Sequence, residues 1–139
     1  MGSEKTIGRK ARNGAPGTVP IKKRSPKDQL YLLRPAFYNL GMGPLYCTES
    51  LPVEGMLSFF PNIRRLIDVH YLEFARPRAP LVQALGAEHQ SVPVLIIAAG
   101  RRVKSTAPEP QQVRGVRFFT SEQAIRGYLS VQYALPQAG

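Results

Sequence analysis

Apolar and polar residues follow two kinds of pattern from Leu30 onward. Short apolar or alternating runs predict β-strands, whereas apolar residues spaced three and four positions apart predict amphipathic helices. The predicted strands are residues 30–33, 67–71, 93–98 and 116–119. The predicted helices begin near Ser50, near Pro80, and at Thr120 or Ser121. The resulting order, β-α-β-α-β-β-α, predicts an α/β fold with a four-stranded mixed sheet.

The helix expected near Ser50 has the clearest spacing, with apolar side chains at i, i+3, i+4 and i+7 from Val53 to Phe60. Residues 93–98 are apolar throughout, as in a strand that is covered on both faces. The first strand–helix–strand unit should be a right-handed parallel crossover, and the last two strands an antiparallel hairpin. Residues 35–44 and 99–115 are expected to be loops, because Gly, Pro and charged residues interrupt both patterns.

Composition adds a basic arm to this picture. The chain of 139 residues carries a net charge of +10, and its first 29 residues hold eight Lys or Arg against two acidic residues. Few large apolar groups accompany them, so residues 1–27 are expected to form a disordered basic arm. The arm would attract nucleic acid by charge, but it has no aromatic residue for base stacking, and a solubilising tail is the preferred interpretation. Residues 28–135 are the predicted domain, and residues 136–139 a C-terminal tail.

Several classes of protein are disfavoured by composition. No apolar run approaches the roughly 20 residues of a membrane span, and no apolar stretch near the N-terminus resembles a signal peptide. A single cysteine forms no intrachain disulfide, and this fits a reducing cytoplasm. One Cys and two His are also too few for a self-contained zinc site. We therefore expect a cytoplasmic protein without a membrane span or a structural metal.

The candidate chemistry centres on Cys47, which stands in Tyr46–Ser50 directly before the first predicted helix. Unpaired N–H groups and the positive end of the helix dipole favour a thiolate at such a position. The alternative is a small buried apolar residue, which is common for free cysteine. Ser50 completes a C-x-x-S motif, in which its hydroxyl either donates to the thiolate or caps the helix.

A second signal lies about forty residues further on. Val92-Pro93 opens a β-rich run, although a central strand normally excludes proline. A thiol at a helix start together with a proline at the start of a buried strand predicts a thioredoxin-like fold. Nearby, Arg76 and Arg78 can meet a carboxylate ligand, with solvated surface arginines as the simpler interpretation.

This arrangement resembles thioredoxin-fold proteins over residues 28–135, particularly glutaredoxins and the N-terminal domain of glutathione transferases. A more detailed match is to a small bacterial thioredoxin-like family of unknown function, many of whose members have a second cysteine where this chain has Ser50. That match is carried by Tyr46-Cys47, Glu54–Leu57, Arg76–Arg78, Leu85-Gly86, Gln90-Ser91 and Pro93–Leu95.

The resemblance implies roles for particular residues. Cys47 would be the nucleophile, and the backbone of Val92 would hold the cysteinyl part of glutathione, before a Val92-Pro93 bond that is expected to be cis. Ser121-Glu122 matches the pair that holds the γ-glutamyl group, although the family order is an acid or amide followed by Ser.

The predicted function is monothiol thiol–disulfide or glutathione-linked chemistry at Cys47, because the chain has no resolving cysteine. Glutathione or a thiol-containing protein would be the partner, and a homodimer is compatible with this function. The alternative is a non-catalytic thioredoxin-fold binding module. Ser50 and the reversed Ser121-Glu122 pair both favour that alternative.

Overall fold

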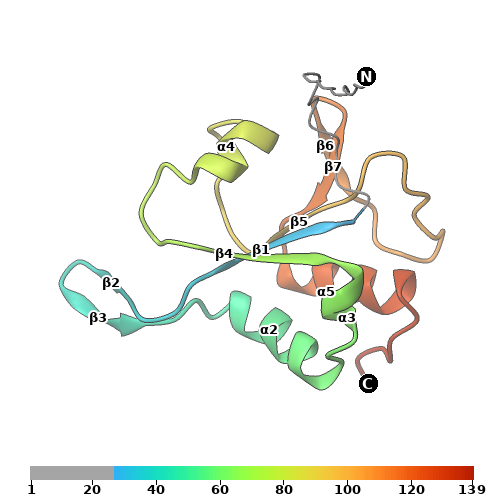
Figure 1. The fold of residues 1–139 in the computed structure, drawn as a ribbon, viewed down its shortest axis with the longest axis horizontal. Coiled ribbons are helices and arrows are strands. Elements are labelled where there is room, and N and C mark those ends of the chain that lie inside the picture. Colours follow the sequence, from blue (N-terminus) through green and yellow to red (C-terminus); the bar gives the residue numbers. More distant parts are fainter. Residues whose placement is uncertain (1–26) are drawn as a thin grey trace, which may run out of the picture.

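The computed structural model describes residues 27–139, so the predicted disorder of the arm at 1–27 lies outside the described residues, apart from Lys27. The described chain contains both helices and strands (Figure 1). In chain order they are β1 (Gln29–Leu33), β2 (Phe37–Asn39), β3 (Met42–Leu45), α2 (Ser50–Phe59), α3 (Ile63–Leu66), β4 (Asp68–Leu72), α4 (Ala79–Leu85), β5 (Val94–Ile96), β6 (Gln111–Val113), β7 (Val116–Phe119) and α5 (Glu122–Gln132).

The main sheet has five strands in the order β4-β1-β5-β7-β6. β1 pairs with β4 in parallel, whereas β5 pairs antiparallel with both β1 and β7. The predicted mixed α/β architecture, the parallel first pair and the antiparallel last pair are therefore confirmed. The predicted number of strands was wrong, because β6 joins the sheet as a fifth strand beside β7.

β6 lies inside the segment that was expected to be a loop, and it is joined to β7 by Arg114-Gly115. Both turn residues have positive φ, 51° and 77°, as a tight two-residue hairpin requires. Gln111 and Gln112 are exposed, so this edge strand has no apolar face that periodicity would reveal. Its position depends on the turn and on pairing with β7.

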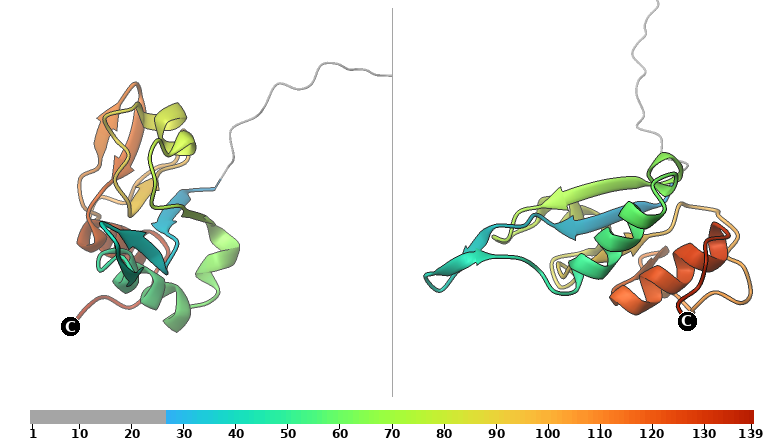
Figure 2. Two further views of the ribbon diagram at one scale, coloured as in Figure 1. Left: turned by 90° about the vertical axis from the view of Figure 1, so that its left-hand side faces the viewer. Right: turned by 90° about the horizontal axis from the view of Figure 1, so that it is seen from below.

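A second hairpin, β2–β3, replaces the loop that was expected over residues 35–44. Its turn, Leu40-Gly41, also has positive φ at both residues, 54° and 76°. The hairpin forms its own two-stranded sheet and extends away from the rest of the domain (Figures 1 and 2). Three of its large apolar side chains, those of Tyr38, Leu40 and Met42, are exposed. The chain continues from this hairpin to Cys47.

Alternate residues of the sheet contribute to two apolar cores. Leu30 and Leu32 point to the face that is covered by α2 and α5, where most of the larger core lies. Val94 and Phe118 pack with Leu81 and Leu85 of α4 on the opposite face. Figure 1 shows α4 on one side of the sheet and α2 and α5 on the other, and the view from below in Figure 2 shows α2 and α5 next to each other.

A buried carboxylate joins the elements of the larger core. Asp28 precedes β1 and is 0% exposed. Its Oδ1 accepts hydrogen bonds from the backbone N–H of Ala98 (2.7 Å) and from Nε of Arg101 (3.0 Å). Its Oδ2 accepts from the hydroxyls of Tyr128 (2.5 Å) and Tyr133 (2.7 Å). Burial, and next the hydrogen bond to Asp28, raise the pKa of both tyrosines, so they remain protonated donors.

We predict that Asp28→Ala lowers the free energy of unfolding by about 3–5 kcal/mol, because it leaves a partly buried guanidinium and three further donors without their acceptor. Urea denaturation provides the measurement. Glu73→Ala is the matched control, since it breaks an ion pair with Arg34 whose side chains are 55% and 74% exposed, and exposed pairs contribute about 1 kcal/mol or less. Equal losses in the two variants would contradict the central role of Asp28.

Candidate functional site

Cys47 occupies the acceptor position at the N-terminus of α2. Its sulfur accepts a hydrogen bond from the backbone N–H of Ser50 (3.3 Å), and its carbonyl oxygen accepts from the N–H of Leu51 (3.1 Å). Glu49 already has helical backbone angles and makes no side-chain cap bond. The half-buried thiol of Cys47 therefore acts as the cap, with its sulfur at the positive end of the helix dipole.

The hydroxyl oxygen of Ser50 has a role that the sequence did not indicate. The residue is 5% exposed, and its Oγ accepts a hydrogen bond from the backbone N–H of Leu33 (3.1 Å). The expected capping by this hydroxyl was wrong, because the cap acceptor is the sulfur of Cys47. The Ser50 hydroxyl instead ties the start of α2 to the last residue of β1.

A cavity of about 330 Å³ opens beside the thiol and contains both predicted catalytic residues. Its walls come from the end of β1, the segment around Cys47, the first turns of α2, and β4. The lining residues are Leu32, Leu33, Pro35, Tyr46, Cys47, Ser50, Leu51, Glu54 and Tyr71.

Two polar residues of this lining, Glu54 and Tyr71, form a cluster with Arg64, which lies outside the lining. Glu54 Oε1 accepts from the hydroxyl of Tyr71 (2.6 Å), and its Oε2 pairs with Nη2 of Arg64 (2.6 Å). Nη1 of Arg64 also donates to the Tyr71 hydroxyl (3.2 Å). Burial, followed by the hydrogen bond to Glu54, raises the pKa of Tyr71. Tyr71 therefore remains a neutral donor at physiological pH.

The Val92-Pro93 peptide bond is cis, as the resemblance implied. Pro93 is buried, and Val92 packs against the core beneath α4. The segment before them is held by Gln90, whose side-chain oxygen accepts from the backbone N–H of Arg78 (2.7 Å) and whose Nε2 donates to the carbonyl of Ala87 (2.8 Å).

Arg78 is buried, so the simpler interpretation of a solvated arginine was wrong. Its side chain donates to the backbone carbonyls of Gln90 (2.7 Å), Phe74 (2.6 Å) and Glu73 (3.2 Å). These acceptors are neutral. Burial is the main cause that lowers the pKa of Arg78, nearby Arg76 lowers it further, and the charge of Cys47 acts in the opposite direction. The guanidinium thus lies within electrostatic reach of the Cys47 side chain.

The Ser121-Glu122 pair is engaged within its own helix. Ser121 caps α5, as expected from its position, by accepting a hydrogen bond from the N–H of Ala124 (3.0 Å). Glu122 pairs with Arg126 one turn later (2.6 Å). Neither side chain lines the cavity that contains Cys47.

Residues next to the predicted site residues in the sequence nevertheless line one cavity together. A polar cavity of about 370 Å³ is lined in part by Glu49, Ser91 and Thr120, which adjoin the starts of α2, β5 and α5. Glu88 and His89 also line it. The three segments therefore converge, although the lining does not include the predicted residues themselves, namely Cys47, Val92, Pro93, Ser121 and Glu122.

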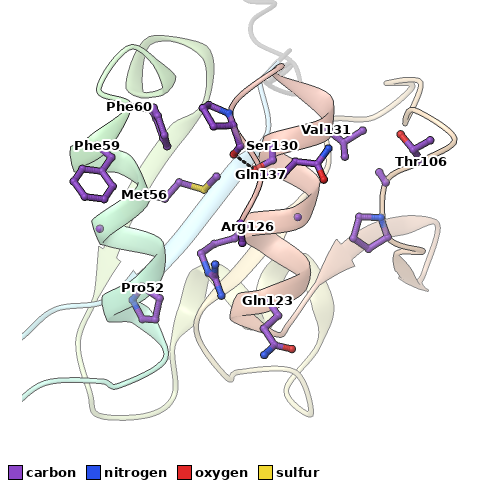
Figure 3. Close-up of a pocket in the computed structure, with 16 residues that line it drawn as sticks. Pro52, Met56, Phe59, Phe60, Thr106, Gln123, Arg126, Ser130, Val131 and Gln137 are labelled. Carbon is purple, nitrogen blue, oxygen red and sulfur yellow. Dashed lines mark hydrogen bonds between the residues drawn. The ribbon is translucent and has the colours of Figure 1, made fainter.

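A larger hollow lies between α2 and α5, and its lining shares no residue with that of the Cys47 cavity. It measures about 940 Å³, and Met56, Phe59 and Phe60 line it on the α2 side. Figure 3 shows Arg126 extending from α5 toward α2, and the hydrogen bond from the Ser130 hydroxyl to the carbonyl of Pro136 (2.9 Å). Sequence patterns missed this groove because it depends on how two helices and the C-terminal segment pack.

Among residues 27–139, no group of three or more His, Cys, Asp or Glu side chains is arranged to hold a metal ion. Within the same part of the chain, the helices are too short or too polar to cross a membrane.

We predict that Ser50→Ala lowers the free energy of unfolding by about 1–3 kcal/mol, because the buried N–H of Leu33 loses its acceptor. The variant keeps the backbone N–H that bonds the sulfur, so its alkylation rate at neutral pH should stay close to that of the wild type. Urea denaturation and iodoacetamide kinetics measure the two effects. A large fall in the alkylation rate without a loss of stability would instead assign the hydroxyl to the thiolate.

Comparison with known proteins identifies a family but no function. Residues 27–137 match the family model described as "Protein of unknown function (DUF3088)". Neither a curated protein nor a solved structure matches the chain at a significant level. Since the matched segment covers most of the chain, the protein belongs to the DUF3088 family.

Proposed function

We propose that the described domain has a thioredoxin-like topology and uses Cys47 for monothiol thiol–disulfide exchange. The strand order β4-β1-β5-β7, with one parallel pair followed by two antiparallel pairs, supports the topology. The positions of Cys47 directly before α2 and of Pro93 directly before β5 along the chain also support it. On this interpretation the β2–β3 hairpin is an insertion before the cysteine, and β6 extends the sheet at one edge.

The observation that carries the proposal is the environment of the Cys47 sulfur. The sulfur accepts a helix N–H, it is half-buried at the wall of a cavity, and a buried guanidinium lies within electrostatic reach. A helix N-terminus and a nearby cation both stabilise a thiolate relative to a thiol, and the thiolate is the attacking species. A cysteine that served only as core packing would need neither feature.

The proposed reaction has two exchanges. In the first, the Cys47 thiolate attacks one sulfur of a disulfide, a new S–S bond forms, and the other sulfur leaves as a thiolate that takes a proton from water. In the second, an external thiolate attacks the substrate-derived sulfur of the mixed disulfide and releases Cys47. The external thiol is needed because Cys47 is the single cysteine of the sequence. Glutathione or a protein thiol would supply it.

Glutathione would use only part of the pattern that the resemblance implies. The backbone of Val92, next to the cis proline, is the proposed contact for its cysteinyl unit. The side chains of Ser121 and Glu122 are bonded within α5, and Glu49 and Glu88 place carboxylates in the adjoining cavity. These features oppose tight binding of the γ-glutamyl carboxylate. We therefore favour glutathione as the releasing thiol over glutathione as a tightly bound cofactor.

A non-catalytic binding module with the same fold is the second candidate. The internal hydrogen bonds of Ser50 and of the Ser121-Glu122 pair favour it, because these side chains then have structural reasons to be present.

Cys47→Ser separates the two candidates. The wild type should reduce a glutathionylated peptide with saturable kinetics in the presence of reduced glutathione, and Cys47→Ser should abolish turnover without unfolding the domain. Circular dichroism checks the fold. Adduct formation alone does not suffice, because any exposed thiol can react. A wild type with no turnover and no glutathione binding by calorimetry would leave the binding module as the better account.

Arg78 provides a test of the electrostatic argument. Arg78→Met should slow alkylation of Cys47 at pH 7 several-fold, because it removes the buried positive charge, whereas Arg78→Lys should retain much of the wild-type rate. Arg65→Met, on the exposed surface of α3, is the control for loss of one positive charge. Equal rates for wild type and Arg78→Met, with the fold intact, would contradict a role for this charge.

A further inference from the structure

The cavity beside Cys47 has a chemical character that narrows the substrates that the cysteine can accept. Most of its wall is apolar and comes from Leu32, Leu33, Pro35 and Leu51. Its volume of about 330 Å³ is at the lower end of the range for small-molecule sites. The cavity is therefore suited to one small group, and it is too small to enclose a folded segment of another protein.

Three polar side chains that line this cavity, Glu54, Ser50 and Tyr71, are already engaged with the protein, and the exposed Tyr46 adds a further hydroxyl at its edge. Both oxygens of Glu54 have donors, from Tyr71 and Arg64. The Ser50 hydroxyl oxygen accepts from Leu33. The sulfur of Cys47 lines the same cavity and accepts a hydrogen bond from the backbone N–H of Ser50, and as a thiolate it is the nucleophile among these groups.

A charged ligand would find no counter-charge here. The lining drawn from the described residues contains no Lys, Arg or His, and its one carboxylate is neutralised by Arg64. Transfer of a phosphate, a carboxylate or an ammonium group from water into such a site is costly without a partner. Apolar groups gain free energy from the same transfer. The lining thus selects neutral, apolar groups.

We propose that this cavity binds the small, neutral, apolar substituent of the disulfide that Cys47 attacks. The inference rests on the proposed thiol–disulfide exchange and names the substrate class for it. Cys47 forms an S–S bond to the sulfur that carries the apolar substituent, and the other sulfur leaves as a thiolate and is protonated by water. The substituent remains in the cavity until a second thiol releases it.

Alkyl methanethiosulfonates test this preference, because they transfer different R–S groups to a thiolate and release the same leaving group, methanesulfinate. Rates of Cys47 modification are measured with methyl, benzyl and sulfonatoethyl reagents, each divided by its rate with 2-mercaptoethanol. We expect the normalised rate for benzyl to exceed that for methyl by about tenfold, the discrimination that an apolar pocket can provide. The normalised rate for the anionic sulfonatoethyl reagent should not exceed that for the methyl reagent.

Two variants on α2 show whether the preference belongs to the cavity. Leu51→Gln changes a lining residue that is 53% exposed, and it should reduce the benzyl preference roughly fourfold, the effect of about one buried CH₂ group. Phe59→Gln changes a side chain that is 83% exposed and lies outside this lining, so it should leave the preference unchanged. Circular dichroism confirms that both variants fold.

Three outcomes would overturn the proposal. The first is a normalised rate for benzyl that is no greater than that for methyl, and the second is a normalised rate for the anionic reagent that exceeds that for benzyl. The third is an equal loss of the benzyl preference in Leu51→Gln and Phe59→Gln. The reagents modify Cys47 in one step and need no second thiol, so the result is independent of turnover. A benzyl preference without peptide turnover would support the cavity and reject the exchange function. Turnover without the preference would reject only the cavity proposal.

Discussion

The buried carboxylate of Asp28 is the interaction on which the rest of the domain depends. It is 0% exposed, and its four hydrogen bonds join β1 to the segment after β5 and to α5. A carboxylate without these donors would not be stable in an apolar core, because burial of an unpaired charge is costly. The hydroxyls of Tyr128 and Tyr133 in turn use it as their acceptor. This mutual requirement specifies one relative placement of β1 and α5, and that placement closes the larger core.

The opposite end of β1 positions the cysteine. Leu33 donates its backbone N–H to the hydroxyl of Ser50, and the N–H of Ser50 in turn donates to the sulfur of Cys47. The same strand is therefore anchored at its start by a carboxylate and at its end by a hydroxyl that belongs to the helix carrying the thiol. Since β1 lies between β4 and β5 in the sheet, these hydrogen bonds fix the start of α2 and the thiol to the packed core. A site supported in this way holds its geometry better than one on a free loop.

Two sides of the cysteine differ in chemistry. The cavity that contains Cys47 is largely apolar, and its carboxylate is paired, whereas the cavity where Glu49, Ser91 and Thr120 meet is polar and includes two glutamates. Arg78 adds a buried positive charge. Its guanidinium donates to backbone carbonyls, which are neutral, so these bonds do not neutralise the charge. The Cys47 sulfur therefore lies at the N-terminus of a helix and beside a largely apolar cavity. That combination leads to the proposed substrate class, an apolar disulfide, in preference to a highly charged one.

Local patterns in the sequence determined the elements with strong periodicity, namely α2, the apolar strand β5, and the helix capped by Ser121. They also placed Cys47 at a helix start, whereas the cis bond before Pro93 was implied by the resemblance to thioredoxin-fold proteins. The hairpin strands were missed because their formation depends on positive-φ turns and on pairing with a neighbour, and neither leaves an apolar period in the sequence. Tertiary structure alone decided that Arg78 is buried and that the Ser50 hydroxyl bonds Leu33. The physical reason is the same in each case: a polar side chain has several available partners along the sequence, and the packing of distant segments selects one.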